Sequence, residues 1–300
     1  MAPGLGIDAG GTRTRWALAG TDGAVLAEGE VAGLSALQMG SASVQATLAQ
    51  LAQQVLTHAR PVRIRAGVTG FGGPNDPLQQ VLAALFGLRP QQVALSSDIE
   101  IAYLDSFAPG EGYVVYAGTG SIGAFIDSSG QFHRAGGRGV YLDDGGGGYA
   151  IARAALRHIW RGEDEQPGRW RNSPMAHAVF TYIGGDDWAL SRQFMYGQER
   201  GAVGQLALAV AASADSDPVA AAILHEAGAE LARLAWALCQ RFGVRPVVLS
   251  GRAASLHTSI YAAMRTALPD AISLTQSGGL AHHAAARIAA TAALEPHTEL

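Results

Sequence analysis

Two aspartates stand where apolar segments end, at positions where a carboxylate could act chemically. Asp8 lies in an apolar segment over residues 4–9 and precedes a pair of glycines. A carboxylate there could hold Mg²⁺ through water, because this ion keeps much of its hydration shell. The alternative is an aspartate that hydrogen-bonds its own turn. Asp98 follows the apolar segment 93–97 and begins a helical pattern, so it is a candidate general base and equally a candidate helix N-cap.

Two short glycine turns, each at the end of an apolar segment, could bind phosphate. Their residues are Gly10, Gly11 and Thr12 in the first turn and Gly118, Thr119, Gly120 and Ser121 in the second. A glycine turn presents backbone N–H groups, and no Cβ blocks the approach of an anion. Either turn alone is compatible with a plain tight hairpin. Two such turns, both carrying a threonine hydroxyl, favour phosphate binding, since binding residues concentrate on loops of this kind.

The second turn also resembles a dinucleotide-binding fingerprint. Residues 118–123 match Gly-x-Gly-x-x-Gly, and Asp143 follows at the spacing of the acidic residue of such sites. The fingerprint requires a helix that begins at the glycines and receives the pyrophosphate at its N-terminus. Here Ile122, Ala124 and Ile126 alternate with small or polar residues, which predicts a strand. We therefore expect a β-hairpin and no nicotinamide cofactor.

Composition excludes several classes of phosphate-handling protein. All 21 basic residues are arginine, and the chain has no lysine. A Walker A loop, a protein kinase and a pyridoxal enzyme each need a lysine at a defined place. Any triphosphate must therefore be held by backbone N–H groups, hydroxyls and a metal ion.

Charge and cysteine content narrow the expected partners and the compartment. The net charge of −4 gives no electrostatic reason to bind nucleic acid or an anionic membrane. No apolar run is long enough for a membrane span, and the first residues do not resemble a signal peptide. The single cysteine, Cys239, excludes a disulfide within the chain. These features predict a cytoplasmic protein.

The element pattern predicts an internal repeat and an α/β fold. Strand, glycine turn, strand, small-residue turn and strand occur twice, about a hundred residues apart. The strands expected in these repeats, and later in the chain, cover residues 4–9, 14–19, 24–31, 62–68, 93–97, 113–117, 121–126, 131–135, 247–249 and 271–274. Helices are expected over residues 41–57, 75–86, 98–105, 148–160, 253–268 and 279–293 and over most of 173–242, with a loop at 161–172. Strands alternating with helices indicate two α/β lobes of related fold.

Two further groups of polar residues are ambiguous in the sequence. Asp143 and Asp144 precede four glycines and a helix start, so helix capping competes with substrate binding. The nine histidines are scattered and show no metal-ligand spacing. Two of them, His282 and His283, are expected on the face of the last helix.

Three segments resemble the motifs of a known superfamily. Residues 6–12, 117–121 and 248–251 resemble the phosphate-1, phosphate-2 and adenosine motifs of the actin-like sugar-kinase superfamily. Residues 137–151 resemble its N-acetylglucosamine kinase branch. That branch is grouped with the activator ATPases of benzoyl-CoA reductase and 2-hydroxyacyl-CoA dehydratase, as the BadF/BadG/BcrA/BcrD ATPase family. The resemblance covers nearly the whole chain, and its motifs occur in the family's order.

The resemblance implies two ribonuclease-H-like lobes, each a mixed sheet flanked by helices, that close over ATP. The lobes would span residues 1–111 and 112–278, and a helix within 279–300 would pack back onto the first lobe. The implied reaction is transfer of the γ-phosphate of ATP to a sugar hydroxyl, presumed to be that at C6, with N-acetylglucosamine or glucosamine as the leading substrate.

The same resemblance implies a role for individual residues. Asp98 would take the proton from the sugar hydroxyl, and Asp8 would hold Mg²⁺ through water. Both glycine turns would bind the phosphates of ATP, and Gly251 would lie near the adenosine. Gly72, Thr119 and Asp144 would join Asp98 in contacting the sugar. The segments 137–139 and 143–146 depart from the usual family pattern, which leaves the identity of the sugar open.

Three other functions remain as alternatives. An electron-transfer activator ATPase would hold an iron–sulfur cluster at a subunit interface, for which the chain offers only Cys239. A nucleotide-dependent scaffold would bind ATP without a small substrate. A repressor-type sugar kinase would carry zinc on a cysteine cluster that this chain lacks. The sequence leaves open whether the protein is a homodimer, and whether Asp143 or Asp144 faces the ligand.

Overall fold

The computed structural model describes residues 3–11, 13–73 and 76–291, and the chain divides into two compact units. The first unit comprises Met1–Asp105 with Gly279–Leu300, and the second comprises Ser106–Gly278. Each unit contains one five-stranded sheet, ordered β3-β2-β1-β4-β5 in the first and β8-β7-β6-β9-β10 in the second. In both sheets the first three strands are antiparallel and the last two run parallel to the central strand. The predicted fold class, two ribonuclease-H-like lobes with mixed sheets, is confirmed.

The elements of the first unit follow the predicted order. Its strands are β1 (Gly4–Ala9), β2 (Arg13–Ala19), β3 (Val25–Ala32), β4 (Arg63–Val68) and β5 (Val93–Ser96). Its helices are η1 (Ala36–Gln38), α1 (Ala42–His58), α2 (Leu78–Phe86), η2 (Pro90–Gln92), α3 (Asp98–Ser106) and α11 (Ala281–Thr291). In α1 the apolar residues recur every three to four positions and are buried, and the Ser41 hydroxyl caps the first turn by accepting from Val44 N over 3.2 Å.

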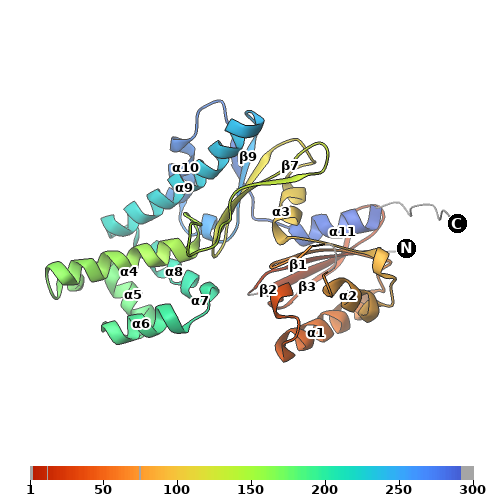
Figure 1. The fold of residues 1–300 in the computed structure, drawn as a ribbon, viewed down its shortest axis with the longest axis horizontal. Helices are drawn as coiled ribbons and strands as arrows, with labels where there is room; N and C mark the ends of the chain where they lie inside the picture. The colour runs from red at the N-terminus through yellow and green to blue at the C-terminus, as the bar shows by residue number, and fades with distance from the viewer. Residues whose placement is uncertain (1–2, 12, 74–75, 292–300) are drawn as a thin grey trace. The chain divides into compact units, whose positions relative to one another are not determined.

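The first sheet is covered by helices on both faces. Figure 1 shows α1 and α2 on one face and α11 on the other. Helix α11 packs so closely on β1 that a Cβ added at Gly6 would lie 2.1 Å from the His282 carbonyl oxygen. Helix α3 lies beside α11, where Ile101 packs against Ala281 and Ala285. The last helix of the chain is therefore an integral layer of the first unit.

The second unit adds a helical region to the same sheet. Its strands are β6 (Tyr113–Ala117), β7 (Ser121–Ile126), β8 (Phe132–Gly136), β9 (Val247–Ser250) and β10 (Leu274–Gln276). Its helices are α4 (Gly148–Glu165), η3 (Arg169–Asn172), α5 (Pro174–Ile183), α6 (Trp188–Gly197), α7 (Arg200–Gln205), α8 (Ala207–Ser213), α9 (Pro218–Phe242), η4 (Ala253–Ser255) and α10 (Thr258–Ala267). Helix α9 packs on the sheet through Leu234 and Leu238, which contact the positions of Gly123 and Gly136.

The helix predicted over 253–268 is divided into η4 and α10, α2 begins at Leu78, and two further predicted boundaries were wrong for local reasons. Helix α4 continues to Glu165, so residues 161–172 are not a single loop. Its polar final turns contain arginine and glutamate, which are good helix formers, and the Glu163 carboxylate then accepts hydrogen bonds from Gly168 N and Trp170 N in the turn that follows. The last strand begins at Leu274, because the Arg265 guanidinium binds the carbonyl oxygens of residues 268, 269 and 272 and holds that segment in a turn.

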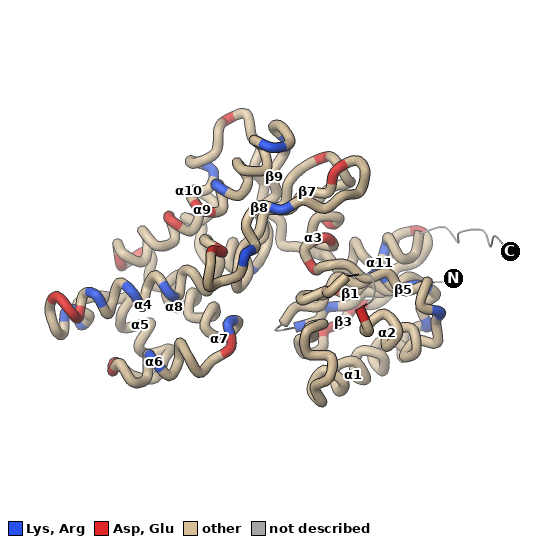
Figure 2. Tube along the Cα trace, in the orientation of Figure 1, with Lys and Arg blue, Asp and Glu red and all other residues tan. Residues whose placement is uncertain are grey.

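Charged residues of both signs are distributed over each unit. Figure 2 shows basic positions along α4 and acidic positions along α9, and the other elements also carry a mixture. Within the part of the chain that the structure describes, none of the helices has both the length and the apolar character that crossing a bilayer requires.

Candidate functional site

Asp8 is held by an arginine on the neighbouring strand. Asp8 of β1 lies directly opposite Arg15 of β2, and Arg15 Nη2 donates to Asp8 Oδ2 over 2.9 Å. The carboxylate is therefore bound across the hairpin and not by its own turn. Burial raises the pKa of Asp8 above its ordinary value, although the Arg15 guanidinium opposes that shift. A half-buried carboxylate with one oxygen paired leaves the other oxygen for a further ligand.

Asp98 is the first residue of α3, and Ser97 separates it from β5. Helix capping at this point is performed by its neighbours. Ser97 Oγ accepts from Glu100 N over 3.3 Å, and the Glu100 carboxylate accepts from Ser97 N over 2.9 Å. This reciprocal pair is a capping box. Asp98 Oδ1 accepts from the adjacent N–H of Ile99, over 3.0 Å. The N-cap alternative for Asp98 is therefore wrong.

The environment of Asp98 favours its protonated form. Burial raises its pKa to about 6, the negative charge of Asp8 adds to the shift, and hydrogen bonds from backbone N–H groups and from the Thr69 hydroxyl oppose it. Thr69 follows β4, and its N–H donates to the Ala9 carbonyl over 2.9 Å. Asp8, Thr69 and Asp98 thus lie at the carboxyl ends of β1, β4 and β5, the edge at which open α/β sheets commonly bind ligands.

The first glycine turn closes tightly. Gly10 N donates to the Arg13 carbonyl over 3.0 Å, and the Gly10 carbonyl accepts from Leu34 N over 3.1 Å. Gly11 is exposed at the tip, with nothing within 4 Å of the place a Cβ would occupy. Thr12 lies outside the described residues. The tip therefore combines an exposed backbone with open space, as phosphate binding requires.

Gly72 lies in a loop that follows β4. Its N–H donates to Asp76 Oδ2 over 3.2 Å, and Asp76 Oδ1 accepts from Leu78 N at the start of α2 over 3.0 Å. The buried Asp76 side chain therefore fixes both the loop and the helix start. The loop is attached to the first sheet just beyond Thr69, which bonds Asp98.

The second glycine turn is fixed by the helix that follows it. Gly118 N donates to the Gly120 carbonyl over 2.8 Å. The carbonyls of Gly118 and Thr119 accept from Gly148 N and Tyr149 N, at the start of α4, over 2.8 and 2.9 Å. β6 and β7 pair antiparallel on either side of the turn, so the predicted hairpin is confirmed and no helix begins at these glycines.

Asp144, not Asp143, faces the second glycine turn. The buried Asp144 carboxylate accepts from Gly139 N over 3.1 Å, and its Oδ2 lies 2.2 Å from the place where a Cβ of Gly120 would stand. Burial raises the pKa of Asp144. Asp143 instead pairs with Arg233 at 3.2 Å. Helix α4 begins after Gly147 without a side-chain cap, so the capping alternative for both aspartates is wrong.

Two further predicted residues lie close to this turn. The buried hydroxyl of Ser121 donates to the Gly145 carbonyl over 2.6 Å, which joins the hairpin to the glycine run. Gly251 follows β9 with φ +99°, and a Cβ there would lie 2.2 Å from the carbonyl oxygen of Ala117. Only glycine can therefore bring the chain this close to the end of β6.

The predicted residues form two groups, one in each unit. Asp8, Gly10, Gly11, Gly72 and Asp98 belong to the first unit, and the remaining described site residues belong to the second. Sequence reasoning missed Arg15, Thr69 and the pair Ser97 and Glu100. The pattern Ser-x-x-Glu at residues 97–100 could have predicted the capping box. The register of a tight hairpin could have placed Arg15 opposite Asp8. Nothing in the sequence indicates a role for Thr69.

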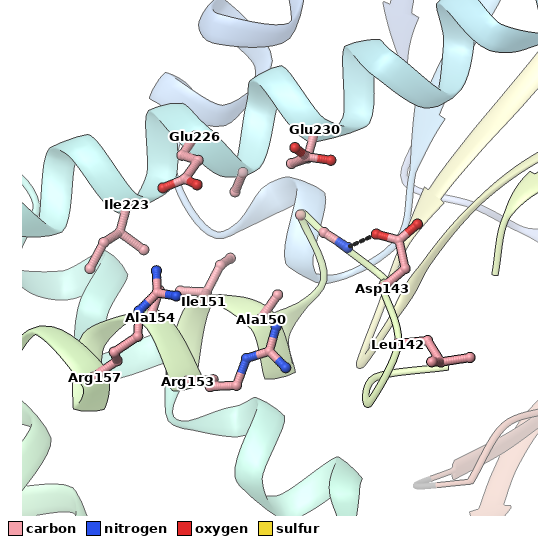
Figure 3. Close-up of a pocket in the computed structure, with 13 residues that line it drawn as sticks. Leu142, Asp143, Ala150, Ile151, Arg153, Ala154, Arg157, Ile223, Glu226 and Glu230 are labelled. Carbon is pink, nitrogen blue, oxygen red and sulfur yellow. Dashed lines mark hydrogen bonds between the residues drawn. The ribbon is translucent and has the colours of Figure 1, made fainter. Parts of the chain in front are cut away.

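A separate cavity of about 250 Å³ lies in the second unit, between α4, α9 and the segment 142–146. Figure 3 shows Arg153 and Arg157 reaching into it from α4, opposite Glu226 and Glu230 of α9. Of the residues discussed above, it is lined by Asp143, Gly145 and Gly146 and by no predicted site residue. The cavity therefore gives no support to the predicted phosphate site.

Solved structures with the same fold include sugar kinases. A proposed N-acetylglucosamine kinase from Chromobacterium violaceum is 24% identical, with a TM-score of 0.70 over 96% of this chain and 99% of that one. A second, from Porphyromonas gingivalis, is 15% identical, with a TM-score of 0.73 over 95% and 96%. A ROK family glucokinase from Streptomyces griseus, solved with glucose and AMPPNP, is 16% identical, with a TM-score of 0.59 over 96% and 98%. At these identities the likeness establishes the fold.

Comparison with curated protein sequences gives no match. The sequence model of one family, in contrast, matches residues 5–294, nearly the whole chain. Together with two related lobes and a glycine turn at the end of each central hairpin, this match shows that the chain belongs to the BadF/BadG/BcrA/BcrD ATPase family.

Proposed function

We propose that this protein is an ATP-dependent sugar kinase that phosphorylates the C6 hydroxyl of an amino sugar, with N-acetylglucosamine or glucosamine as the leading substrate. In this reaction the sugar oxygen attacks the γ-phosphorus as the bond from that phosphorus to the β,γ-bridging oxygen breaks. ADP leaves with the bridging oxygen, and the hydroxyl proton passes to a carboxylate. Such transfer depends mainly on alignment and charge neutralisation.

The state of Asp98 carries the proposal. Its carboxylate is not needed to cap α3, because Ser97 and Glu100 do so. Its pKa, raised to about 6, leaves it largely ionised at neutral pH and a better proton acceptor than an ordinary aspartate. We assign it the role of general base toward the sugar hydroxyl. The Thr69 hydroxyl, which bonds this carboxylate, would orient it.

Backbone donors and Asp8 would handle the triphosphate. The turns at residues 10–12 and 118–121 would each direct N–H groups and a threonine hydroxyl to the phosphates, in place of the lysine that the chain lacks. Asp8 fits a water-mediated Mg²⁺ contact, because Arg15 occupies only one of its carboxylate oxygens. The ion, when bound, would neutralise charge on the triphosphate. Gly251 would lie against the adenosine.

The choice of an amino sugar is supported by the family and by the solved relatives. Two structures of this fold are described as proposed N-acetylglucosamine kinases, and a third holds glucose with an ATP analogue. We propose that Gly72, Asp98, Thr119 and Asp144 are the residues that contact the sugar. The Asp144 carboxylate already accepts from the backbone N–H groups of Gly139 and Arg138, so a contact with the sugar would use the remaining acceptor capacity of its oxygens.

The surroundings of the single cysteine, Cys239, disfavour the function of an electron-transfer activator. Cys239 is buried in α9, and burial raises the pKa of its thiol, which disfavours the thiolate that an iron–sulfur cluster needs. We therefore place the protein among the kinases of the family.

The proposal is tested by ADP release over a panel of amino sugars, hexoses and polyols, with ATP and Mg²⁺ present. We expect rapid release with N-acetylglucosamine or glucosamine and slow release with polyols and without sugar. Mass spectrometry of the product should show one added phosphate, and periodate oxidation should place it at C6. A response that does not differ between the sugars and a blank would instead favour a nucleotide-dependent scaffold.

A further inference from the structure

Three potential metal ligands meet on the surface of the first unit, in elements far apart in the sequence. Glu28 lies on β3, while His282 and His283 lie on α11. One ligand atom from each residue lies within 4.8 Å of the other two. The sequence shows no metal-ligand spacing among the histidines, because the third ligand is more than 250 residues away and the packing of α11 brings it close.

The distances between the three ligand atoms are close to those found around a bound zinc ion. His282 Nε2 lies 3.5 Å from Glu28 Oε2, and His283 Nε2 contacts the same oxygen. The two imidazole rings are 4.3 Å apart between centroids. Ligand atoms bound tetrahedrally to zinc at its usual bond lengths lie about 3.3 Å from each other. The three atoms therefore need only rotamer changes to surround one ion.

The burial of the three side chains decreases from helix to strand. The His282 side chain is 5% exposed, His283 is 14% exposed and Glu28 is 57% exposed. His282 Nδ1 is buried without a hydrogen-bond partner among the described residues. The rigid histidines would supply a preformed pair of ligands. The exposed side of the cluster would leave room for water as a fourth ligand.

The two histidines differ in their surroundings. His282 is the more enclosed of the two, and it directs Nε2 toward Glu28 Oε2 over 3.5 Å, so that this nitrogen faces the place where an ion would lie. The carboxylate of Glu28 has its pKa lowered by the hydrogen bond from His283 and is ionised. The competing interpretation is a direct contact between His283 Nε2 and Glu28 Oε2 that joins helix and strand without an ion.

We propose that Glu28, His282 and His283 form a binding site for a divalent transition-metal ion of the zinc class. Two imidazoles and one carboxylate are a donor set that zinc accepts, with water completing the coordination. The ion would fasten α11 to β3, next to the point where the Gly279 carbonyl accepts from Arg15 over 3.3 Å. It would be a structural ion within the first unit, distinct from the Mg²⁺ expected near Asp8 and independent of the proposed kinase reaction.

The site is tested by calorimetric titration of Zn²⁺ into tag-free, full-length protein after treatment with a chelator. We expect one ion per chain, with affinity falling at least about tenfold in Glu28→Gln and in His283→Gln, since even the loss of an outer partner of a ligand costs that much. Substituting Co²⁺ should give a visible absorption band that both variants weaken. The melting temperature should rise with Zn²⁺ and return when EDTA is added.

Glu30→Gln is the matched control, because Glu30 is an exposed carboxylate on the same strand that pairs with Arg13. It should bind Zn²⁺ as the unaltered protein does. Equal affinity in Glu28→Gln and in the unaltered protein would overturn the proposal, as would the absence of any bound ion. Glu28 is exposed, so failure of its variant to fold is not expected, and ATP-dependent activity is not needed for any of these measurements.

Discussion

Arg15 Nη2 lies 2.9 Å from Asp8 Oδ2, across the antiparallel pair β1 and β2. Through its other terminal nitrogen, Arg15 also donates to the Gly279 carbonyl over 3.3 Å, just before α11. One side chain therefore joins the proposed metal-associated carboxylate to the segment that leads into the last helix. Removing it would affect both the charge of Asp8 and the attachment of α11.

A double-mutant cycle on Asp8 and Arg15 should show strong coupling. Arg15→Gln leaves a half-buried carboxylate without its partner and should reduce the free energy of unfolding by about 1–3 kcal/mol at pH 7. Asp8→Asn/Arg15→Gln should lose less than the sum of the single changes, because the uncompensated charge is gone. Urea unfolding of the four proteins measures the coupling. Additive losses would show that the contact contributes nothing.

The pH dependence of catalysis should follow the ionisation of Asp98. A general base must be ionised, and its pKa is about 6 in the unliganded protein, so kcat/KM should rise as the pH rises through about 6. Asp8→Asn removes a negative charge that raises this pKa, so the acid limb of that variant should move to lower pH even if its rate is reduced. Rates measured at subsaturating ATP and sugar between pH 5 and 8 give the acid limb of kcat/KM for the unaltered protein and for Asp8→Asn. A limb centred near pH 4 in the unaltered protein would contradict the assignment.

Asp98→Asn should stabilise the protein at alkaline pH. The folded-state pKa of about 6 is above the ordinary aspartate pKa of 3.8, so Asp98 contributes its full stability below pH 3.8 and loses it as the pH rises through 6. Asparagine avoids that loss, which is at most about 3 kcal/mol for a shift of this size. Calorimetric melting temperatures should therefore favour the variant at pH 8 and converge with those of the unaltered protein near pH 4. Asp22→Asn, at an exposed turn residue, serves as the control and should show no such crossover.

Gly251→Ala should be more damaging than Gly243→Ala. Both glycines have positive φ, +99° and +89°, but a Cβ at Gly251 would meet the Ala117 backbone while one at Gly243 would meet nothing within 4 Å. Both variants force an alanine to a positive φ, at a conformational cost of about 1–3 kcal/mol, and only the first adds a clash. We expect ATP affinity, measured by calorimetry, to fall at least about tenfold in Gly251→Ala alone. Equal affinities in the two variants would separate Gly251 from the nucleotide site.

The sequence predicted the repeated strands and turns well because their signals are local. Alternating apolar residues and glycine pairs specify hairpins over a few positions, as in β1–β2 and β6–β7. The polar end of α4 was predicted wrongly, because polarity was weighed above the helix propensity of its residues. Contacts between distant segments could not be predicted. No sequence pattern predicts the bond from Thr69 to Asp98 or the cluster of Glu28 with two histidines.

The most direct test of the proposed chemistry compares ATP binding and turnover in Asp98→Asn. With Mg²⁺ present, calorimetry should give a dissociation constant for ATP within about twofold of that of the unaltered protein, while kcat for sugar phosphorylation should fall by roughly 10²–10⁴, the contribution of a general base. Asp22→Asn should preserve both quantities. Near-normal turnover in Asp98→Asn would contradict the role of Asp98 and with it the proposed mechanism.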